Sequence, residues 1–354
     1  MYGVDTVQIL TDRPYQVYIG SGILTRLGDL LPERSDRGVI ALVADDIVDR
    51  LYGNMVTGAL QESGYQVYRL VFPHGEANKN IDQLSRLLSF LAKSHLSRTD
   101  LIVALGGGVT GDLAGLAAAI YLRGIDYIQM PTTFLAAIDS SVGGKTAVDL
   151  PEGKNQVGAF WQPVAVVCDT VTFDTLPDMV FIDGTAEAVK YGVLADPELF
   201  SLLSEGNFSD RLSMIIRRCV EIKGHFVHDD ERDTGSRQLL NLGHTIGHAV
   251  EQCSDYTITH GHAVAIGMSI ISKAAVAAGL CEKSVSQLIE TALINNHLPI
   301  SCDYPLARIV EVIQADKKRR GNIISLVVPE RIGQCRLLEL DIQELPAFIA
   351  PGLA

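Results

Sequence analysis

Apolar and polar positions follow two different rhythms along the chain, and the change falls near residue 177. Before it, short runs rich in β-branched residues are separated by longer segments whose apolar positions recur every three to four residues. The runs have the length and composition of strands, and the longer segments have the period of helices. The pattern predicts strands at 39–44, 66–72, 100–105, 127–130 and 165–168, and helices at 46–63, 81–93 and 112–122.

Strands that alternate with helices predict an α/β domain with a mostly parallel sheet of the nucleotide-binding kind. Two further β-like runs, 6–10 and 15–19, are separated by Thr-Asp-Arg-Pro. Their spacing is typical of a hairpin. We expect this hairpin at the edge of the sheet.

The second half of the chain has an almost entirely helical period. The pattern predicts helices at 183–203, 208–227, 237–253, 261–278 and 283–296, and β-like runs only at 323–328 and 335–340. We therefore expect two domains, 1–177 and 178–354, the second mainly α-helical.

Composition narrows the class of protein. The 354 residues include 29 Lys and Arg against 42 Asp and Glu, a net charge of −13, which argues against a nucleic-acid partner because phosphate binding needs a basic surface. The N-terminus lacks the pattern of a secretory signal, and the apolar runs are too short to span a membrane. The six cysteines are dispersed singly, as in proteins with reduced thiols. We expect a soluble cytoplasmic protein with no membrane partner.

A glycine-rich turn joins a predicted strand to a helix in DLIVALGGGVTGDLAGLAAA. Glycine permits positive φ and lets backbone amides approach a pyrophosphate, and a helix N-terminus attracts negative charge. Gly106–Gly108 and Gly111 fit the GxGxxG spacing, which alone is weak, but their place in mid-sheet favours a dinucleotide. Asp45, Glu76 and Lys79 are candidates for its adenosine end, although each alone is more typical of a turn or surface residue.

The segment 131–155 is polar and rich in small residues. It contains a glycine pair together with Asp139, Lys145, Lys154 and Asn155. A surface Ω-loop has this composition. Lysine charges and backbone amides also form anion-binding loops for a phosphate or a carboxylate. Both interpretations stay open.

Four of the nine histidines fall within 19 residues. In RQLLNLGHTIGHAVE, His244 and His248 are one helical turn apart, which predicts that they share a helix face with Arg237 and Asn241. A cluster of this density on apolar helices favours metal binding or catalysis over isolated structural histidines.

The other two histidines, His260 and His262, stand at a predicted helix start in THGHAVAIGM. GTAEAVKYG places Glu187 and Lys190 on one face of another helix. One carboxylate and two imidazoles form a catalytic zinc set that leaves coordination positions open for substrate oxygens. The spacing does not say which two histidines bind.

Four consecutive basic residues, 317–320, precede the last β-like runs. Such a run is more often a solvated turn than a binding site. On an acidic protein it is also a candidate contact for an anionic substrate.

Together, five segments resemble the 3-dehydroquinate synthase family: LGGGVTGDLAGLAAAIYLRG, QMPTTFLAAIDSSVGGKTAVDLPEGKN, GTAEAVKYG, RQLLNLGHTIGHAVE and HGHAVAIGM. The resemblance runs from about residue 15 to about residue 340. The DSSVGGKT and LNLGHTIGHAVE blocks are specific. The glycine turn is shared with the wider sugar phosphate cyclases and with enzymes similar to glycerol dehydrogenase.

The resemblance implies a lyase of the shikimate pathway, which makes aromatic amino acids. It would convert 3-deoxy-D-arabino-heptulosonate 7-phosphate to 3-dehydroquinate and phosphate by metal-assisted transient oxidation, phosphate elimination, re-reduction and aldol closure. The implied cofactors are NAD, bound by 1–177, and a divalent metal, zinc or cobalt, held with the substrate by 178–354. A homodimer is also implied. The open alternatives are a sister cyclase acting on amino-heptulosonate or sedoheptulose 7-phosphate, an NAD-dependent polyol dehydrogenase, and a non-catalytic binding module.

Matched position by position, the resemblance assigns a role to each site residue. The implied metal ligands are Glu187, His244 and His260. The implied catalytic and substrate residues are Arg123, which would reach a neighbouring subunit's phosphate site, and Lys145, Asn155, Lys190, Lys223, Arg237, Asn241, His248, Lys317 and Lys318. The implied cofactor residues are Asp45, Glu76, Lys79, Gly107, Gly108, Asp112, Thr132, Thr133, Asp139, Lys145, Lys154 and Thr175.

The chain departs from the family's usual pattern at three places. Met179-Val180 replaces Arg-Glu, and Asp233 replaces a Glu, keeping the charge with a shorter reach. His262 replaces the Glu of the usual His-Gly-Glu, which removes a negative charge near the metal and adds a competing imidazole. None of these changes removes an implied metal ligand, so we expect activity. They leave the choice among sister cyclases open.

Overall fold

The computed structural model describes residues 3–31, 38–317 and 322–353. The chain forms two compact units: unit 1 is Met1–Pro177 with Ile216–Arg232, and unit 2 is Asp178–Ile215 with Asp233–Ala354. Unit 1 thus includes most of helix α7 (Leu212–Asp229), which the sequence analysis assigns to the second domain. Residues of α7 contact the rest of unit 1: Lys223 Nζ lies 2.7 Å from the Asp139 carbonyl oxygen, and His228 Nδ1 lies 3.3 Å from the Leu10 carbonyl oxygen.

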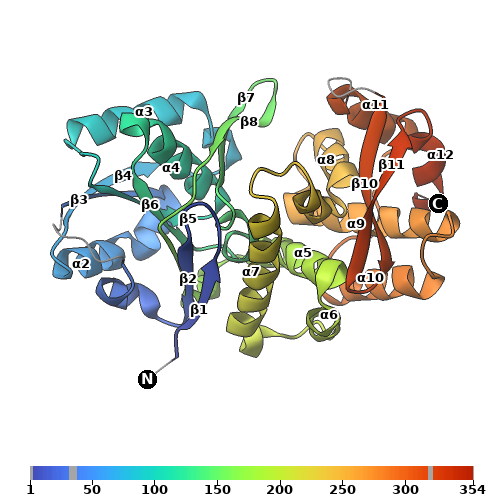
Figure 1. Cartoon of the computed structure of the whole chain (residues 1–354), viewed down its shortest axis with the longest axis horizontal. Coiled ribbons are helices and arrows are strands. Elements are labelled where there is room, and N and C mark those ends of the chain that lie inside the picture. The colour runs from blue at the N-terminus through green and yellow to red at the C-terminus, as the bar shows by residue number, and fades with distance from the viewer. Residues whose placement is uncertain (1–2, 32–37, 318–321, 354) are drawn as a thin grey trace. The chain divides into compact units, whose positions relative to one another are not determined.

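Unit 1 is built around a seven-stranded sheet (Figure 1). Its strands are β1 (Asp5–Ile9), β2 (Tyr15–Gly20), β3 (Val39–Asp45), β4 (Gln66–Phe72), β5 (Leu101–Gly106), β6 (Asp126–Pro131) and β9 (Ala165–Asp169). The order is β1-β2-β9-β6-β5-β3-β4, and all neighbours are parallel except β1 and β2, an antiparallel hairpin at one edge. The predicted mostly parallel sheet with an edge hairpin is confirmed.

Helices cover both faces of this sheet (Figure 1). Every residue of β5 is buried, as expected of a central parallel strand. Alternate strand residues point to opposite faces, so Leu42 and Val103 pack with α2, whereas Val43 and Ile102 pack with α3 and α4. These helices are α1 (Asp46–Val48), α2 (Asn54–Glu62), α3 (Ile81–Lys93) and α4 (Gly108–Ile120).

A second, two-stranded sheet occupies much of the segment 131–155. β7 (Lys145–Leu150) pairs antiparallel with β8 (Gly153–Phe160), and β7 packs against α4. The prediction of a loop here is wrong for these residues. The pattern fails because half of β8 is exposed and its first four residues carry no apolar side chain.

Unit 2 is mainly helical, as predicted, but two predicted helices are interrupted. The first divides into α5 (Asp178–Ala195) and α6 (Pro197–Ser204), because the Asp196 side chain caps a new helix. The second divides into a 3₁₀ helix (Ser236–Asn241) and α8 (His244–Cys253), because Gly243 adopts a φ of 78°. The remaining elements are α9 (His260–Ala277), α10 (Lys283–Asn295), α11 (Leu306–Lys317), α12 (Leu345–Ile349) and an antiparallel hairpin of β10 (Ile323–Arg331) and β11 (Gln334–Asp341).

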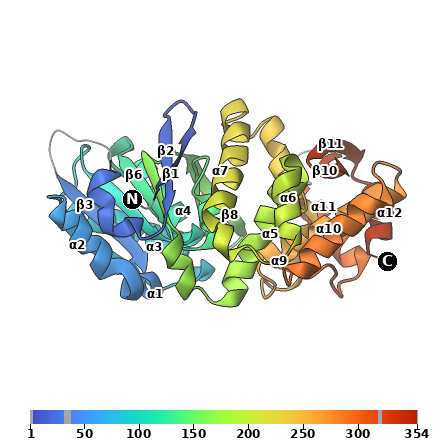
Figure 2. The ribbon, with the colours of Figure 1, turned by 90° about the horizontal axis from the view of Figure 1, so that it is seen from below.

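Helix α9 is buried along most of its length, against α5, α8 and α10 (Figure 2). It has 18 residues, as do α5 and α7. No helix in the described ranges combines the length and the apolar character needed to cross a lipid bilayer. The helices of unit 2 instead bury their apolar faces against one another.

Candidate active site

The glycine turn of unit 1 lies where the order of the strands reverses. From β3 the chain goes to β4 on one side and then returns to β5 on the other side. The carboxyl ends of β3 and β5 are therefore neighbours, and Asp45 and Gly106 stand at those ends. Open α/β sheets bind their ligands at such a switch point. One Asp45 carboxylate oxygen caps α1 by accepting hydrogen bonds from the backbone of Ile47 and Val48.

Glycine is needed at the three positions of this turn because it has no side chain, and not because it permits a positive φ. None of Gly106–Gly108 has a φ in the left-handed region, which corrects the sequence-based expectation. A Cβ on Gly107 would lie 3.0 Å from Thr133 Cγ2, and one on Gly108 would lie 3.1 Å from Ser140 Oγ. Around them, four buried hydroxyls form no hydrogen bond with any residue that the structure describes: Thr110, Thr132, Ser140 and Ser141. Buried polar groups are rarely left unpaired, so this cradle suits a polar ligand.

Beside the turn, a buried lysine stands among three carboxylates. Lys79 Nζ lies 2.7 Å from Glu76 Oε1, 3.5 Å from Asp112 Oδ2 and 3.8 Å from Asp149 Oδ1. Burial lowers the pKa of Lys79, but the three carboxylates raise it more. Burial raises the pKa of Asp112 to about 7, and the charges of Glu76 and Asp149 add to this, while the charge of Lys79 lowers it. The structure thus brings together three predicted cofactor residues and adds Asp149, which the sequence analysis missed.

Two other predicted cofactor residues already have protein partners. The Thr175 hydroxyl lies 2.5 Å from the Tyr52 hydroxyl and donates to the Thr172 carbonyl. Asp139 forms an ion pair with Lys223, whose Nζ also lies 2.7 Å from the Asp139 carbonyl oxygen. The predicted substrate lysine is therefore neutralised by a predicted cofactor residue.

The β7–β8 hairpin separates Lys145 from Asn155, two residues of the candidate anion-binding segment. Lys145 is the first residue of β7 and pairs with Phe160 at the far end of β8. Lys154 and Asn155 lie at the other end, where Asn155 has a φ of 55° and donates its backbone N–H to Asp149. The structure does not bring Lys145 and Asn155 together.

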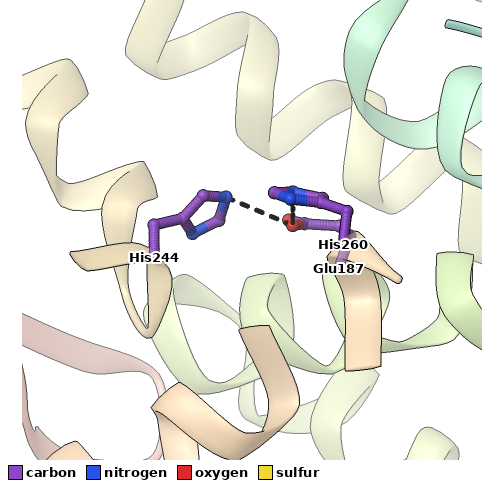
Figure 3. Close-up of side chains that lie close together, drawn as sticks. All are labelled: Glu187, His244 and His260. Carbon is purple, nitrogen blue, oxygen red and sulfur yellow. Dashed lines mark ion pairs between the residues drawn. The ribbon is translucent and has the colours of Figure 1, made fainter. Parts of the chain in front are cut away.

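In unit 2, three predicted metal ligands converge (Figure 3). Their potential ligand atoms, one each from Glu187, His244 and His260, all lie within 4.8 Å of one another. Glu187 Oε1 is 3.3 Å from both His244 Nε2 and His260 Nε2. Glu187 comes from α5, and the two histidines are the first residues of α8 and α9. One carboxylate and two imidazoles are a donor set for zinc or a similar divalent ion.

Glu187 is fully buried on α5. Its Oε1 faces the two imidazoles, and its Oε2 faces the Lys190 ammonium. Burial alone would raise the pKa of Glu187, but the charges of Lys190 and His244 outweigh it and hold the pKa well below its usual range. Lys190, one turn further along α5, is also buried and forms an ion pair with this carboxylate. A buried carboxylate that stays ionised and faces two imidazole nitrogens is suited to bind a cation together with them.

The two ring nitrogens of His260 face different carboxylates. Nε2 faces Glu187, and Nδ1 lies 3.2 Å from Glu251 Oε2. Burial lowers the pKa of His260, but the two carboxylates raise it more, to about 10. A carboxylate on the second nitrogen is the usual means of orienting a metal-binding histidine. The sequence analysis missed this role of Glu251, although Glu251 lies on α8 seven residues after His244, two helical turns along the same face.

His248 lies beside both predicted ligands, with ring centroids 5.5 Å from His244 and 5.8 Å from His260. With Glu251 and His260 it forms a second possible metal set. His248 is exposed, whereas the Glu187 set is centred on a buried carboxylate. The Glu187 set is therefore the better candidate.

The remaining predicted substrate residues are scattered. Arg237, which is buried, and Asn241, which is exposed, lie on the 3₁₀ helix, and the break at Gly243 separates them from α8, so the predicted single helix face shared with His244 and His248 is wrong. Arg123 is exposed, with a φ of 70°. Lys317 ends α11, its side chain lies outside the described part, and Lys318 lies outside the described residues.

The three departures from the expected pattern have distinct surroundings. Met179 and Val180 are exposed on the first turn of α5, and Asp233 has a φ of 58°. His262 points to Asp183 and belongs to neither possible metal set among the described residues, so the expected competing ligand is not found.

Comparison with known proteins decides the family. Two family profiles match the chain, 3-dehydroquinate synthase N-terminal over residues 69–183 and 3-dehydroquinate synthase C-terminal over residues 184–319. The chain belongs to the 3-dehydroquinate synthase family. A 3-dehydroquinate synthase of Clostridium acetobutylicum is 41% identical over 346 residues, covering 96% of this chain and 97% of that protein. One of Pelobacter propionicus is 42% identical over 347 residues, covering 95% and 96%.

Structures in the 3-dehydroquinate synthase fold include relatives with other products. A 2-deoxy-scyllo-inosose synthase, solved in complex with carbaglucose-6-phosphate, NAD⁺ and Co²⁺, superposes with a TM-score of 0.88 at 26% identity, covering 98% of this chain and 99% of that chain. The predicted family and fold class, an α/β domain followed by a mainly helical one, are confirmed.

Proposed function

We propose that this protein is an enzyme that converts 3-deoxy-D-arabino-heptulosonate 7-phosphate to 3-dehydroquinate with release of phosphate. Relatives named 3-dehydroquinate synthase match nearly the whole chain at 41–42% identity. The observation that carries the proposal is the convergence of Glu187, His244 and His260 within 4.8 Å.

The proposed cofactors are one divalent metal, zinc or cobalt, and NAD. When bound, they supply a Lewis acid for a substrate hydroxyl and a hydride acceptor. Glu187 and the Nε2 atoms of His244 and His260 would hold the metal. The buried, ionised carboxylate and the two imidazoles directed at it fit this role, and three protein ligands leave positions open for substrate oxygens.

The proposed dinucleotide site is the switch point of unit 1. The amides of Gly107 and Gly108 and the unpaired hydroxyls of Thr110 and Thr132 supply donors for phosphate and carboxamide groups. Asp45 ends β3 at the same edge and suits a ribose hydroxyl. The remaining proposed cofactor residues are Glu76, Lys79, Asp112, Thr133, Asp139, Lys154 and Thr175.

We propose separate substrate contacts for the basic residues. Because the hairpin holds Lys145 and Asn155 apart, the two would contact different substrate oxygens. Lys223 would bind a substrate carboxylate or hydroxyl while shared with Asp139. Arg237 has the bidentate geometry that suits a carboxylate. The other proposed substrate residues are Arg123, Lys190, Asn241, Lys317 and Lys318.

His248 is the proposed proton shuttle. It is exposed, yet its ring lies beside those of His244 and His260. An imidazole at that place can move a proton between solvent and a substrate hydroxyl.

Phosphate release tests the proposed reaction. The protein, loaded with NAD and Zn²⁺ or Co²⁺, should release phosphate from the heptulosonate phosphate without accumulating NADH. Net NADH formation would indicate a polyol dehydrogenase. Faster phosphate release from amino-heptulosonate or sedoheptulose 7-phosphate would indicate a sister cyclase, and no release from any of the three would contradict the proposal.

We further propose a cytoplasmic homodimer, as the family resemblance implies. Both Leu122 and Arg123 have positive φ, 51° and 70°, and both side chains are exposed. Such strained backbone is concentrated at functional sites, which supports a role for Arg123 at a neighbouring subunit. Mixing inactive Arg123→Ala with an inactive Glu187→Gln variant should restore part of the activity if sites are shared between subunits. Sedimentation should show a dimer, and a monomer would contradict this proposal.

A further inference from the structure

We propose that Asp183 is a positioning residue for the metal site, because it fixes the start of α9 and with it His260. This inference rests on the proposed function in taking His260 as a metal ligand. It concerns a contact between α5 and α9, two helices of unit 2.

Asp183 accepts three hydrogen bonds at one carboxylate oxygen. Oδ1 lies 2.5 Å from Thr259 Oγ1, 3.0 Å from the backbone nitrogen of His262 and 3.0 Å from His262 Nδ1. The Thr259 hydroxyl and His262 Nδ1 are themselves 2.9 Å apart. Asp183 and His262 are 15% and 12% exposed, so water competes little for these bonds.

These bonds replace the missing cap of α9. Thr259 is the N-cap residue, but its side chain accepts no capping hydrogen bond from the backbone of the first turn. The first backbone N–H groups of a helix need such an acceptor, and a cap is worth about 1 kcal/mol. Here Asp183 satisfies the N–H of His262 from a different helix.

Gly261 brings the two helices into direct backbone contact. A Cβ on Gly261 would lie 1.8 Å from the Asp183 carbonyl oxygen. No side chain fits there unless the start of α9 moves away from α5. The hydrogen bonds and the glycine therefore fix the same distance by independent means.

The contact lies one helical turn from the proposed metal ligands. Asp183 and Glu187 are four residues apart on α5 and share a face. His260, the first residue of α9, places Nε2 3.3 Å from Glu187 Oε1. Loss of the Asp183 bonds would free the α9 start and change that separation. A neutral His262 with a proton on Nδ1 suffices as donor.

The contact also constrains the residue at position 262. In this chain α5 supplies the carboxylate and α9 the donor. Glu at 262 would face Asp183, and two carboxylates in contact repel. The two positions are therefore expected to depend on each other.

Metal affinity in a double-mutant series tests this inference. We would measure Co²⁺ affinity by chelator competition, and the visible Co²⁺ spectrum, for the full-length protein and for Asp183→Ala, Asp183→Asn, His262→Glu and the double variant Asp183→Asn, His262→Glu. Asp183→Ala should weaken Co²⁺ binding about tenfold and alter the spectrum, as for other residues that orient metal ligands. Asp183→Asn keeps an acceptor and should bind nearly normally. His262→Glu should bind weakly, and the double variant should recover.

The outcomes separate the inference from the proposed function. Wild-type protein that binds no Co²⁺ would contradict the proposed metal site itself. Normal affinity and spectrum in Asp183→Ala, with binding abolished in Glu187→Gln, would overturn the positioning role alone. If Asp183→Ala does not fold, the His262→Glu variants test the positioning role of Asp183. Equal Co²⁺ affinity in His262→Glu and in the double variant would also overturn that role.

Discussion

The two units contain ionic clusters of opposite balance. In unit 1 one ammonium, Lys79, serves three carboxylates. In unit 2 one carboxylate, Glu187, faces an ammonium and two imidazoles. Both clusters have a buried centre, so water does little to compensate either imbalance.

This difference in charge determines which ion each cluster would bind: a proton in unit 1 and a divalent cation in unit 2. Unit 1 has an excess of negative charge, and its least favoured carboxylate, Asp112, binds a proton below a pH of about 7. Unit 2 has nitrogen and oxygen donors directed at one point, and a divalent cation fits them better than protons do. To infer what a cluster of charged residues binds, both its net charge and the direction of its ligand atoms are needed.

The largest expected effect comes from Glu187→Gln. An amide keeps the shape but removes the anionic ligand at the centre of the unit 2 cluster. Because a bound Lewis acid contributes several kcal/mol, we expect activity to fall by about three orders of magnitude and metal content to fall towards zero. Phosphate release and metal analysis of the purified variant check this.

Glu290→Gln is the matched control for that variant. Glu290 is also a carboxylate of unit 2 that faces a lysine, with Oε1 2.8 Å from Lys273 Nζ, but it lies on α10 outside the proposed site. Glu290→Gln should retain activity and metal. Equal metal content in Glu187→Gln and Glu290→Gln would contradict the proposal that the Glu187 cluster holds the metal.

The second effect is a pH dependence of stability in unit 1. The pKa of Asp112 is about 7 in the folded protein, against an ordinary value of 3.8 for an aspartate, so the folded state binds the proton more tightly than the unfolded chain does. Stability contributed by this group is therefore lost as pH rises from about 4 to 7. Between pH 5 and pH 8 wild type should lose about 1–4 kcal/mol relative to Asp112→Asn, measured by urea unfolding.

Asp149→Asn sharpens the same test. The Asp149 carboxylate raises the pKa of Asp112, so its removal should shift the pH-dependent loss to lower pH. A difference between wild type and Asp112→Asn that stays constant from pH 5 to 8 would show that Lys79 neutralises Asp112 fully, against the proposed imbalance.

Glu251→Gln has a smaller expected effect, through His260. The amide oxygen can still accept from Nδ1, but the charge that orients and polarises the ring is lost. Metal affinity should fall about tenfold, as for other second carboxylates of metal-binding histidines. Chelator competition measures it. His248→Gln should leave metal affinity unchanged and His244→Gln should abolish binding; the reverse result would place the metal in the set of His248, Glu251 and His260.

Local patterns predict elements well where caps and periodicity agree. The helix at 81–93 is found with its predicted bounds, because Asn80 caps it and its apolar face repeats regularly. Pro197 and Gly243 are residues that indicate a helix break. The apolar period continues across both, and it therefore predicts continuous helices there. Alternation does not predict the β7–β8 hairpin, because the first four residues of β8 carry no apolar side chain.

The candidate site depends on contacts between distant segments. Glu187, His244 and His260 come from three helices, so spacing alone indicated a metal site without choosing its ligands, and the family resemblance supplied the choice. Asp149 and Asp183 carry no local motif, and their ion-pair partners, Lys79 and His262, lie 70 or more residues away. The separation of Lys145 from Asn155 follows only from the strand register.

The smallest expected effect comes from Gly107→Ala in unit 1. Gly107 has a φ of −77°, which alanine adopts without strain, so the fold should persist. The new Cβ would lie 3.0 Å from Thr133 Cγ2 and would narrow the cradle at the start of α4. NAD affinity, measured by calorimetry, should fall several-fold, about 1 kcal/mol, with little change in melting temperature. Gly58→Ala, which contacts nothing within 4 Å, is the matched control and should leave NAD affinity unchanged. Equal NAD affinity in both variants would mean that the dinucleotide does not approach this turn. The glycine turn of unit 1 would then not be part of the NAD site.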